Sequence, residues 1–261
     1  MKKIINKLKK IIKKKNKTSL IVYSVLRILV IICMIRELYH GNSENAMLCV
    51  LSLILFLVPS IAEETFKIKL PVVLEVIILL FIFSAEILGT INDFYGKFEI
   101  FDDILHTLNG FLAASVGFSL VYLLNENFVS FKLSPIFVSL VAFCFSMTIG
   151  VVWEFYEYGM DHLGHDTQND KYLYELNTTY LDEGKVSLEG IDHTIIYDKD
   201  GNEILYIKGY LDIGLHDTMH DLIVNFIGAV VFCIFGYLYI INKDKYQVAG
   251  IFLVRKSEGA I

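Results

Sequence analysis

Proline and charged residues are both scarce in this chain. Only three of its 261 residues are proline, which excludes a collagen-like or proline-rich disordered chain. Charged residues make up 20% and apolar residues 55%, so the chain is too apolar for an ordinary soluble domain. Its net charge of −6 argues against a general nucleic-acid binder, which needs positive charge to release counterions from phosphate. The composition, with a mean hydropathy of +0.55, therefore points to a membrane protein.

Cysteine is scarce as well, and no two cysteines have the spacing of a zinc-binding pair. The four lie singly in apolar stretches: Cys33, Cys49, Cys144 and Cys233. Single thiols in such places are usually packing residues. A disulfide framework is therefore not expected.

The chain contains several long apolar stretches with few charged residues. A membrane-spanning helix needs about 20 mostly apolar residues. Six stretches meet this requirement: 19–38, 45–62, 70–91, 101–124, 135–160 and 215–241. The chain is therefore predicted to be an all-α polytopic membrane protein with about six transmembrane helices, five of them within residues 19–160.

The basic residues predict the orientation of these spans. Nine lysines lie within residues 1–18, and the cytoplasmic side of a membrane protein carries the excess of lysine and arginine. Placing this leader inside puts 16 of the 23 basic residues in the cytoplasm, together with a tail over 242–261. We expect both termini on the cytoplasmic side of a bacterial plasma membrane. The leader has apolar residues at helical spacing and is either an amphipathic surface helix or a plain topology signal.

One long hydrophilic segment, residues 161–214, is expected outside the cell as a small extracytoplasmic insertion. It carries a net charge of −8. Residues 194–197 and 203–207 read as strands, and the turn-forming residues 198–202 lie between them. The insertion is therefore predicted to contain a β-hairpin.

Ionisable and amide side chains recur at helical spacing at the ends of three spans. Charged groups inside a membrane are costly, so they normally face the bundle interior and have partners. The three sets are Asp102, His106 and Asn109; Glu154, Glu157 and Asp161; and Asp217, Asp221 and Asn225. At a rise of 1.5 Å per residue, His106 and Asp221 lie about 8 to 9 Å below the outer ends of their helices, and Glu154 reaches a similar depth. We expect the three sets to converge in one outward-facing zone.

Carboxylates and imidazole gathered at one depth predict a divalent metal site, an acid/base pair or a cation path. The alternative is a hydrogen-bond network that only holds the bundle together. The expected metal ligands are His106, Glu154, Asp217 and Asp221, and the expected acid/base residues are Glu154, Glu157 and Asp221. The residues expected beside them are Asp102, Asp103, Asn109, Asn225, Asp161 and His220. The cofactor would be an unidentified divalent metal ion, with zinc, manganese and magnesium all open.

Three functions are compatible with such a site. The leading hypothesis is a protein among membrane lipids that acts on a lipid or lipid-linked envelope molecule at the outer leaflet. The second is a cation- or proton-coupled transporter, which needs a polar path to the cytoplasmic face. The third is a non-catalytic envelope scaffold whose outer loop binds a partner. The choice between enzyme, transporter and scaffold, and the oligomeric state, stay open at this point.

The motifs at the three span ends resemble a known family. They read Asp102-Asp103-x-x-His106-x-x-x-Gly110, Trp153-Glu154-x-x-Glu157 and Asp217-Thr218-Met219-x-Asp221, followed by Asn225-x-x-Gly228. In order and spacing they resemble the YjdF-like family of uncharacterised bacterial inner-membrane proteins over roughly residues 70–240. Met219 stands where the family has glutamine, while Asp166-Thr167-Gln168 in the loop repeats the family's Asp-Thr-Gln signature. A weaker similarity runs to VanZ-like membrane proteins. The resemblance implies a role for the motif residues but supplies no activity.

Overall fold

The computed structural model describes residues 16–98, 100–127, 132–163, 167–169, 171–181, 184–212 and 214–256. Within these residues six helical stretches are long and apolar enough to cross a membrane: Lys17–Tyr39, Ser43–Phe66, Val72–Ile91, Phe101–Glu126, Pro135–His162 and Leu215–Ile241. They match the six predicted spans and confirm an all-α membrane fold with a small β insertion. Most of the predicted leader lies outside the described residues.

The chain divides into two compact units. Unit 1 comprises residues 1–149 and 224–261, and unit 2 comprises residues 150–223. Two helices, α8 (Pro135–His162) and α9 (Leu215–Ile241), contribute residues to both units.

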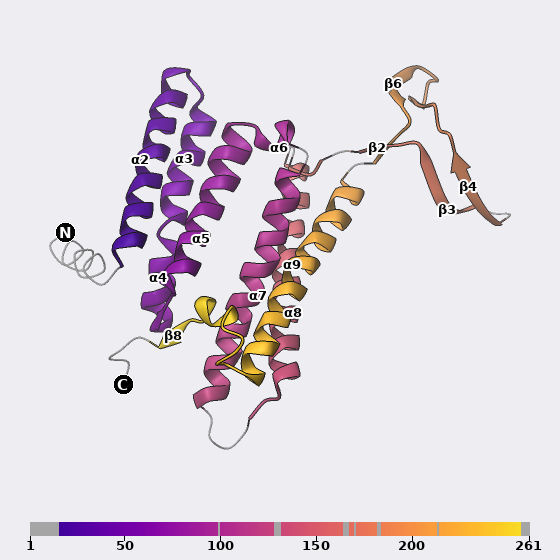
Figure 1. Ribbon diagram of the computed structural model, residues 1–261. Coiled ribbons are helices and arrows are strands. Elements are labelled where there is room, and N and C mark those ends of the chain that lie inside the picture. Colours follow the sequence, from indigo (N-terminus) through magenta and orange to yellow (C-terminus); the bar gives the residue numbers. More distant parts are fainter. Residues whose placement is uncertain are drawn as a thin grey trace. The chain divides into compact units, whose positions relative to one another are not determined.

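In unit 1, α2 (Lys17–Tyr39) and α3 (Ser43–Leu55) lie side by side (Figure 1). Both begin at an asparagine whose side-chain oxygen accepts a backbone N–H of the first turn, Asn16 for α2 and Asn42 for α3. Such caps satisfy donors that a helix start otherwise leaves unpaired. The hairpin is therefore encoded locally by two caps and two apolar runs.

The second and third spans are less regular than a straight helix. Within the second, α3 ends at Leu55 and α4 (Val58–Phe66) starts with Pro59 in its first turn, where proline's missing N–H costs nothing. The third begins as α5 (Val72–Phe83) and continues as the π-helix η1 (Ser84–Ile91), before the short helix α6 (Phe94–Lys97). A π-helix of this length is rare and often marks a functional position.

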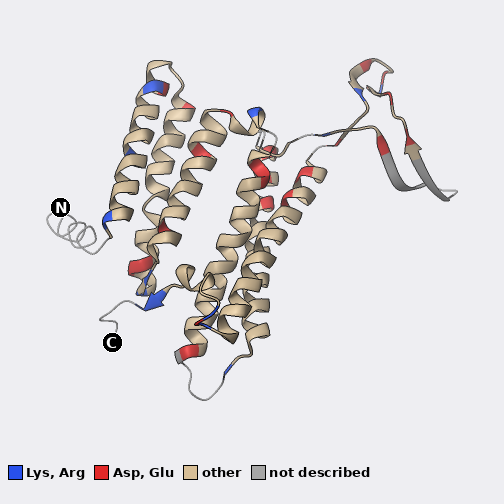
Figure 2. Ribbon diagram, in the orientation of Figure 1, with Lys and Arg blue, Asp and Glu red and all other residues tan. Residues whose placement is uncertain are grey.

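The rest of unit 1 packs around α7 (Phe101–Asn127). Figure 2 shows this helix with acidic residues near both ends and an uncharged middle. Its middle contributes Ala114 and Phe118 to a core that also contains Val138 of α8 and Phe232 of α9. The ring of Phe118 lies 5.8 Å from that of Phe232 in an edge-to-face arrangement. Aromatic packing of this kind stabilises the interior beyond the area it buries.

Residues near the carboxyl end return to this core. The 3₁₀ helix η2 (Ala249–Phe252) is followed by β8 (Arg255–Lys256), which pairs antiparallel with β1 (Ile68–Lys69). Phe252, Leu253 and Val254 are buried against the same cluster. Part of the segment that sequence analysis assigned to a tail thus packs within unit 1.

Unit 2 carries three antiparallel strand pairs. They are β2 (Lys171–Leu173) with β7 (Tyr210–Asp212), β3 (Glu175–Leu181) with β4 (Gly184–Glu189), and β5 (His193–Tyr197) with β6 (Glu203–Lys208). The β5–β6 pair is the predicted hairpin, which is confirmed. The other two pairs were not predicted.

The β5–β6 turn is organised by Asp198. Its Oδ1 accepts the backbone N–H groups of Asp200 at 2.9 Å and Asn202 at 2.8 Å, and its Oδ2 accepts the Asn202 side-chain amide at 2.9 Å. The hydrogen bond from the Asn202 side chain, with those from the backbone, holds the pKa of Asp198 below its usual value. The turn is therefore stabilised by the ionised carboxylate.

We expect the turn to lose this stabilisation in acid. The contribution is present above the ordinary aspartate pKa of about 3.9 and is lost as the pH falls through the lowered value in the folded protein. Replacing Asn202 by alanine should raise the Asp198 pKa, which the pH dependence of the Asp198 carboxyl ¹³C signal reports. Glu203→Ala should leave it unchanged. Equal titration curves for Asn202→Ala and wild type would contradict this account.

Candidate functional site

Three carboxylates come together in unit 2. Glu154 and Glu157 lie one turn apart near the end of α8, and Asp221 lies in the second turn of α9. One carboxylate oxygen of each lies within 4.8 Å of those of the other two. Glu154 is 5% exposed and Asp221 is 2% exposed. The acid/base residues expected from sequence are therefore neighbours, two of them buried.

Asp217 lies one turn before Asp221 on α9, and an oxygen of each lies within 4.8 Å of the other. Both oxygens of Asp217 have further contacts. Oδ2 accepts the backbone N–H of Asn169 at 2.7 Å, and Oδ1 lies 3.6 Å from the Lys171 ammonium. Asp217 thus holds the start of the β segment while it lies beside Asp221.

A short strap, residues 167–169, connects the end of α8 with the start of α9. The Thr167 N–H donates to Asp161 Oδ1 at 2.7 Å. The Thr167 hydroxyl has two acceptors within reach, the same Asp161 oxygen and the Glu157 carbonyl at 2.9 Å. The buried Gln168 side chain donates to the Thr218 hydroxyl of α9. Sequence reasoning missed this strap, although the loop's repeat of the Asp-Thr-Gln signature was a signal for it.

We expect Thr167→Val to loosen the strap. The change removes the hydroxyl that donates to Asp161 or to the Glu157 carbonyl. A hydrogen bond is worth about 1 kcal/mol, so local opening should become at least about fivefold more frequent. Hydrogen exchange of a peptide covering residues 163–171 measures this opening. Thr148→Val is the matched control, because the Thr148 hydroxyl donates to the Cys144 carbonyl within its own helix. Equal exchange of the 163–171 peptide in both variants would contradict a structural role for the strap.

Unit 1 contains the candidate residues of α7, together with Asn225 of α9. On α7, His106 Nε2 lies 3.5 Å from Asp102 Oδ1, and His106 is 7% exposed. One turn further, the Asn109 amide donates to Asn225 Oδ1 of α9 at 3.1 Å. Asn225 in turn donates to the sulfur of Met147 at 3.7 Å. The predicted polar face of α7 therefore faces α9 at Asn109.

Two glycines let α7 and α9 approach closely beside this amide pair. A Cβ on Gly110 would lie 2.0 Å from the Asn225 carbonyl oxygen, and one on Gly228 would lie 1.9 Å from the Thr107 carbonyl oxygen. Ser146 of α8 donates to the Gly110 carbonyl at 2.7 Å. The glycines of the motifs thus position the helices that carry the polar residues.

The remaining candidates have other surroundings. Asp103 lines a cavity on the surface of unit 1, and the His220 side chain in unit 2 is exposed. Asp161 is engaged by the strap. Whether His106 and Asp102 join the carboxylates of unit 2 stays a prediction from the sequence.

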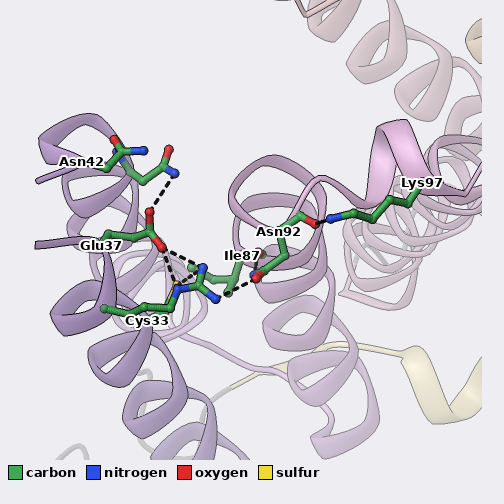
Figure 3. A network of polar contacts seen from close by, with 8 residues as sticks. Cys33, Glu37, Asn42, Ile87, Asn92 and Lys97 are labelled. Carbon is green, nitrogen blue, oxygen red and sulfur yellow. Dashed lines mark hydrogen bonds and ion pairs between the residues drawn. The ribbon is translucent and has the colours of Figure 1, made fainter. Parts of the chain in front are cut away.

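A second polar network lies away from these motifs, on α2, α3 and η1 (Figure 3). Arg36 Nε donates to Glu37 at 2.7 Å, and Nη1 donates to Asn92 at 3.1 Å. Asn45 donates to the other Glu37 oxygen at 3.1 Å. Every charged group of this network has a partner from the protein itself, so the network ties three elements together.

The carboxylate cluster has the chemistry of a cation site. Carboxylate oxygens are the ligands preferred by hard divalent ions such as Mg²⁺ and Mn²⁺. Three of them within 4.8 Å repel one another unless a cation or a shared proton offsets their charge. The same group can therefore hold a metal ion or exchange a proton with a bound molecule.

A family model described as "Predicted membrane protein (DUF2238)" matches residues 19–242. The chain belongs to this family. The DUF2238 match includes the first membrane-spanning helix from residue 19, the other five in full, and every candidate site residue. The family description places its members in a membrane and names no activity. No curated protein and no solved structure matches the chain.

Proposed function

We propose that this DUF2238 protein holds a hard divalent cation, Mg²⁺ or Mn²⁺, between Glu154, Glu157 and Asp221, and acts with it on a lipid or lipid-linked envelope molecule. The observation that carries the proposal is the approach of one oxygen from each carboxylate to within 4.8 Å, with Glu154 and Asp221 buried. Ionised carboxylates at membrane depth are costly, and a divalent ion offsets that cost. Helix-to-helix hydrogen bonding alone does not require three acids at one point.

The donor set favours a hard ion over zinc. All three groups present oxygen, and no cysteine is among them. A bound ion would polarise a phosphoryl or carbonyl oxygen of the substrate and orient it. Glu157 is less buried than Glu154 and Asp221 and would exchange a proton with the bound molecule.

His106 stays a proposed fourth ligand on the strength of its helical position. It lies three residues before Asn109 on α7, and Asp221 lies four residues before Asn225 on α9. From the sequence alone, His106 and Asp221 both lie about 8 to 9 Å from the outer ends of their helices, at a rise of 1.5 Å per residue. His106→Ala tests the assignment by its effect on Mn²⁺ affinity.

We propose that the site faces outward, with both termini in the cytoplasm of a bacterium. The nine amino-terminal lysines support this orientation. We further propose that the YjdF-like resemblance and the DUF2238 match describe one family, since both cover the three motif-bearing helices.

The transporter alternative has less support from the packing of unit 1. Transport needs a polar path, whereas beyond the amide pair the space between α7, α9 and η2 is occupied by Phe111, Phe232 and Phe252. Their ring centroids lie 5.0 to 6.1 Å apart. Aromatic packing of this density favours chemistry at one side of the membrane over passage through it.

Metal content of the purified full-length protein tests the proposal. After loading with Mn²⁺ and washing, wild type should retain about one ion, and Glu154→Ala combined with Asp221→Ala should retain none. Asp200→Ala with Glu203→Ala, in the exposed hairpin, is the matched control and should retain the ion. Equal and negligible metal in all three would overturn the metal site. Mn²⁺ flux into proteoliposomes that Glu157→Gln abolishes would favour the transporter instead.

A further inference from the structure

A groove lies on unit 1 between the first turns of α7 and the middle of α9. Its volume is about 370 Å³, and its lining is almost entirely apolar. The walls are Ile104, Thr107, Leu108, Phe111, Gly228 and Val231, and Asp103 and Ile100 lie at the end nearest the start of α7. We call this feature the α7–α9 groove. Asp103 is the one ionisable residue of this lining, and Thr107 adds a hydroxyl group.

The groove is held open by contacts that leave its walls little room to move. Gly228 rests directly on the Thr107 backbone, since a Cβ there would lie 1.9 Å from the Thr107 oxygen. Phe111 is fixed by edge-to-face contacts with Phe232 at 5.0 Å and Phe252 at 5.1 Å. Closing the groove would require these packed groups to shift. Closely packed interiors resist such movement.

The position of the groove determines what can fill it. Both helices cross the membrane, and the rim residues Ile104 and Val231 are 53% and 40% exposed. In a bilayer such apolar surfaces contact acyl chains, not water. An unfilled groove would forfeit dispersion contacts along its walls. The natural occupant is therefore a hydrocarbon chain of the surrounding lipid.

The dimensions fit one acyl chain. From Asp103 to Phe111 the groove follows α7 for about 12 Å, given a rise of 1.5 Å per residue. Its volume accommodates on the order of twelve groups the size of a water molecule, each about 30 Å³. The groove also follows a membrane-spanning helix, and acyl chains extend across the leaflet in the same general direction.

We infer that the α7–α9 groove binds one acyl chain of a bilayer lipid whose polar end donates a hydrogen bond to Asp103. Asp103 is half-buried at the end of the groove, three residues from His106 on α7. A carboxylate there selects a headgroup with an ammonium or hydroxyl donor. The inference rests on the proposed function and deepens it, because it says where the acyl chain and the polar end of the lipid are held. The binding itself needs no metal.

Photo-crosslinking in nanodiscs tests the groove. The probe is a phosphatidylethanolamine with a diazirine on its acyl chain, used with full-length protein in EDTA. Labels should concentrate on Thr107, Leu108 and Phe111. Ile104→Trp, or Val231→Trp from the opposite wall, should reduce this labelling at least fivefold, whereas Leu120→Trp on the lipid-facing side of α7 should not. Uniform labelling of all lipid-facing residues, or labelling unchanged in both groove variants, would overturn the inference.

A comparison of two phospholipids tests whether the headgroup donates a hydrogen bond to Asp103. Phosphatidylethanolamine has N–H donors, whereas the quaternary ammonium of phosphatidylcholine has none. The first should label the groove at least threefold more than the second, and Asp103→Ala should remove that difference. Equal labelling by both lipids in wild type would contradict the role of Asp103. Because EDTA is present throughout, groove labelling that persists while Mn²⁺ binding fails separates this inference from the metal site.

Discussion

We expect Glu154→Gln and Asp221→Asn each to lower the affinity of the protein for Mn²⁺ by about 100-fold or more. Loss of residues that merely support metal ligands commonly costs 10- to 100-fold, and loss of a ligand oxygen should cost at least as much. Both side chains are buried and contribute to the three-carboxylate cluster. An amide of the same size keeps the packing and removes the charge. Equilibrium titration with Mn²⁺, followed by the electron paramagnetic resonance of the free ion, measures the effect.

We expect Asp217→Asn to lower the Mn²⁺ affinity less than Glu154→Gln or Asp221→Asn does. Its Oδ2 accepts from the Asn169 backbone and its Oδ1 lies near Lys171, so its oxygens have structural contacts already. We therefore expect its affinity loss to be tenfold or less, with weakened anchoring of the β2 strand. If Asp217→Asn abolishes binding while Asp221→Asn does not, the assignment of ligands is wrong.

We expect Gly228→Ala to destabilise the protein by about 3 kcal/mol or more, the upper end of what overpacking usually costs. The added methyl would lie 1.9 Å from the Thr107 carbonyl oxygen, and backbone cannot move aside as a side-chain tip can. The helices must separate, which also disturbs the Asn109–Asn225 hydrogen bond. Thermal unfolding in detergent should show a large fall in Tm.

Gly159→Ala is the matched control for this substitution. Gly159 is also helical, but a Cβ there meets nothing within 4 Å. Alanine in a helix is favoured over glycine by about 1 kcal/mol, so this variant should be neutral or more stable. Equal melting temperatures for Gly228→Ala and Gly159→Ala would show that close packing of α7 on α9 does not limit stability.

The membrane-spanning fold was predictable because each span is a run of apolar residues that needs no distant partner. The hairpin over 193–208 was predictable for the same reason, since its turn residues lie between its strands. The β2–β7 pair was not, because it joins Lys171 to Asp212 across about forty residues. The π-helix η1 was not either, since an apolar run gives no sign of a changed hydrogen-bond register.

The candidate site was predictable in part. Helical spacing indicated that Glu154 and Glu157 share a face, and it placed Asp221 at a matching depth on another helix. The contacts of Asp217 were not foreseeable, because Asn169 and Lys171 reach it from a loop about 50 positions away. The strap combines such non-local hydrogen bonds, to Thr218 and Asp217, with bonds to α8 that are six and ten positions away. The α7–α9 groove likewise arises from two glycine contacts that only tertiary packing creates.

Anomalous diffraction from Mn²⁺-loaded crystals shows whether Glu154, Glu157 and Asp221 hold a divalent cation. We expect one strong peak bound by an oxygen of each of the three carboxylates, at about the 2.1 Å typical of small hard cations. The peak should vanish in Asp221→Asn. Loaded crystals without a peak at these carboxylates, or with peaks only on exposed acids of the β segment, would contradict the account.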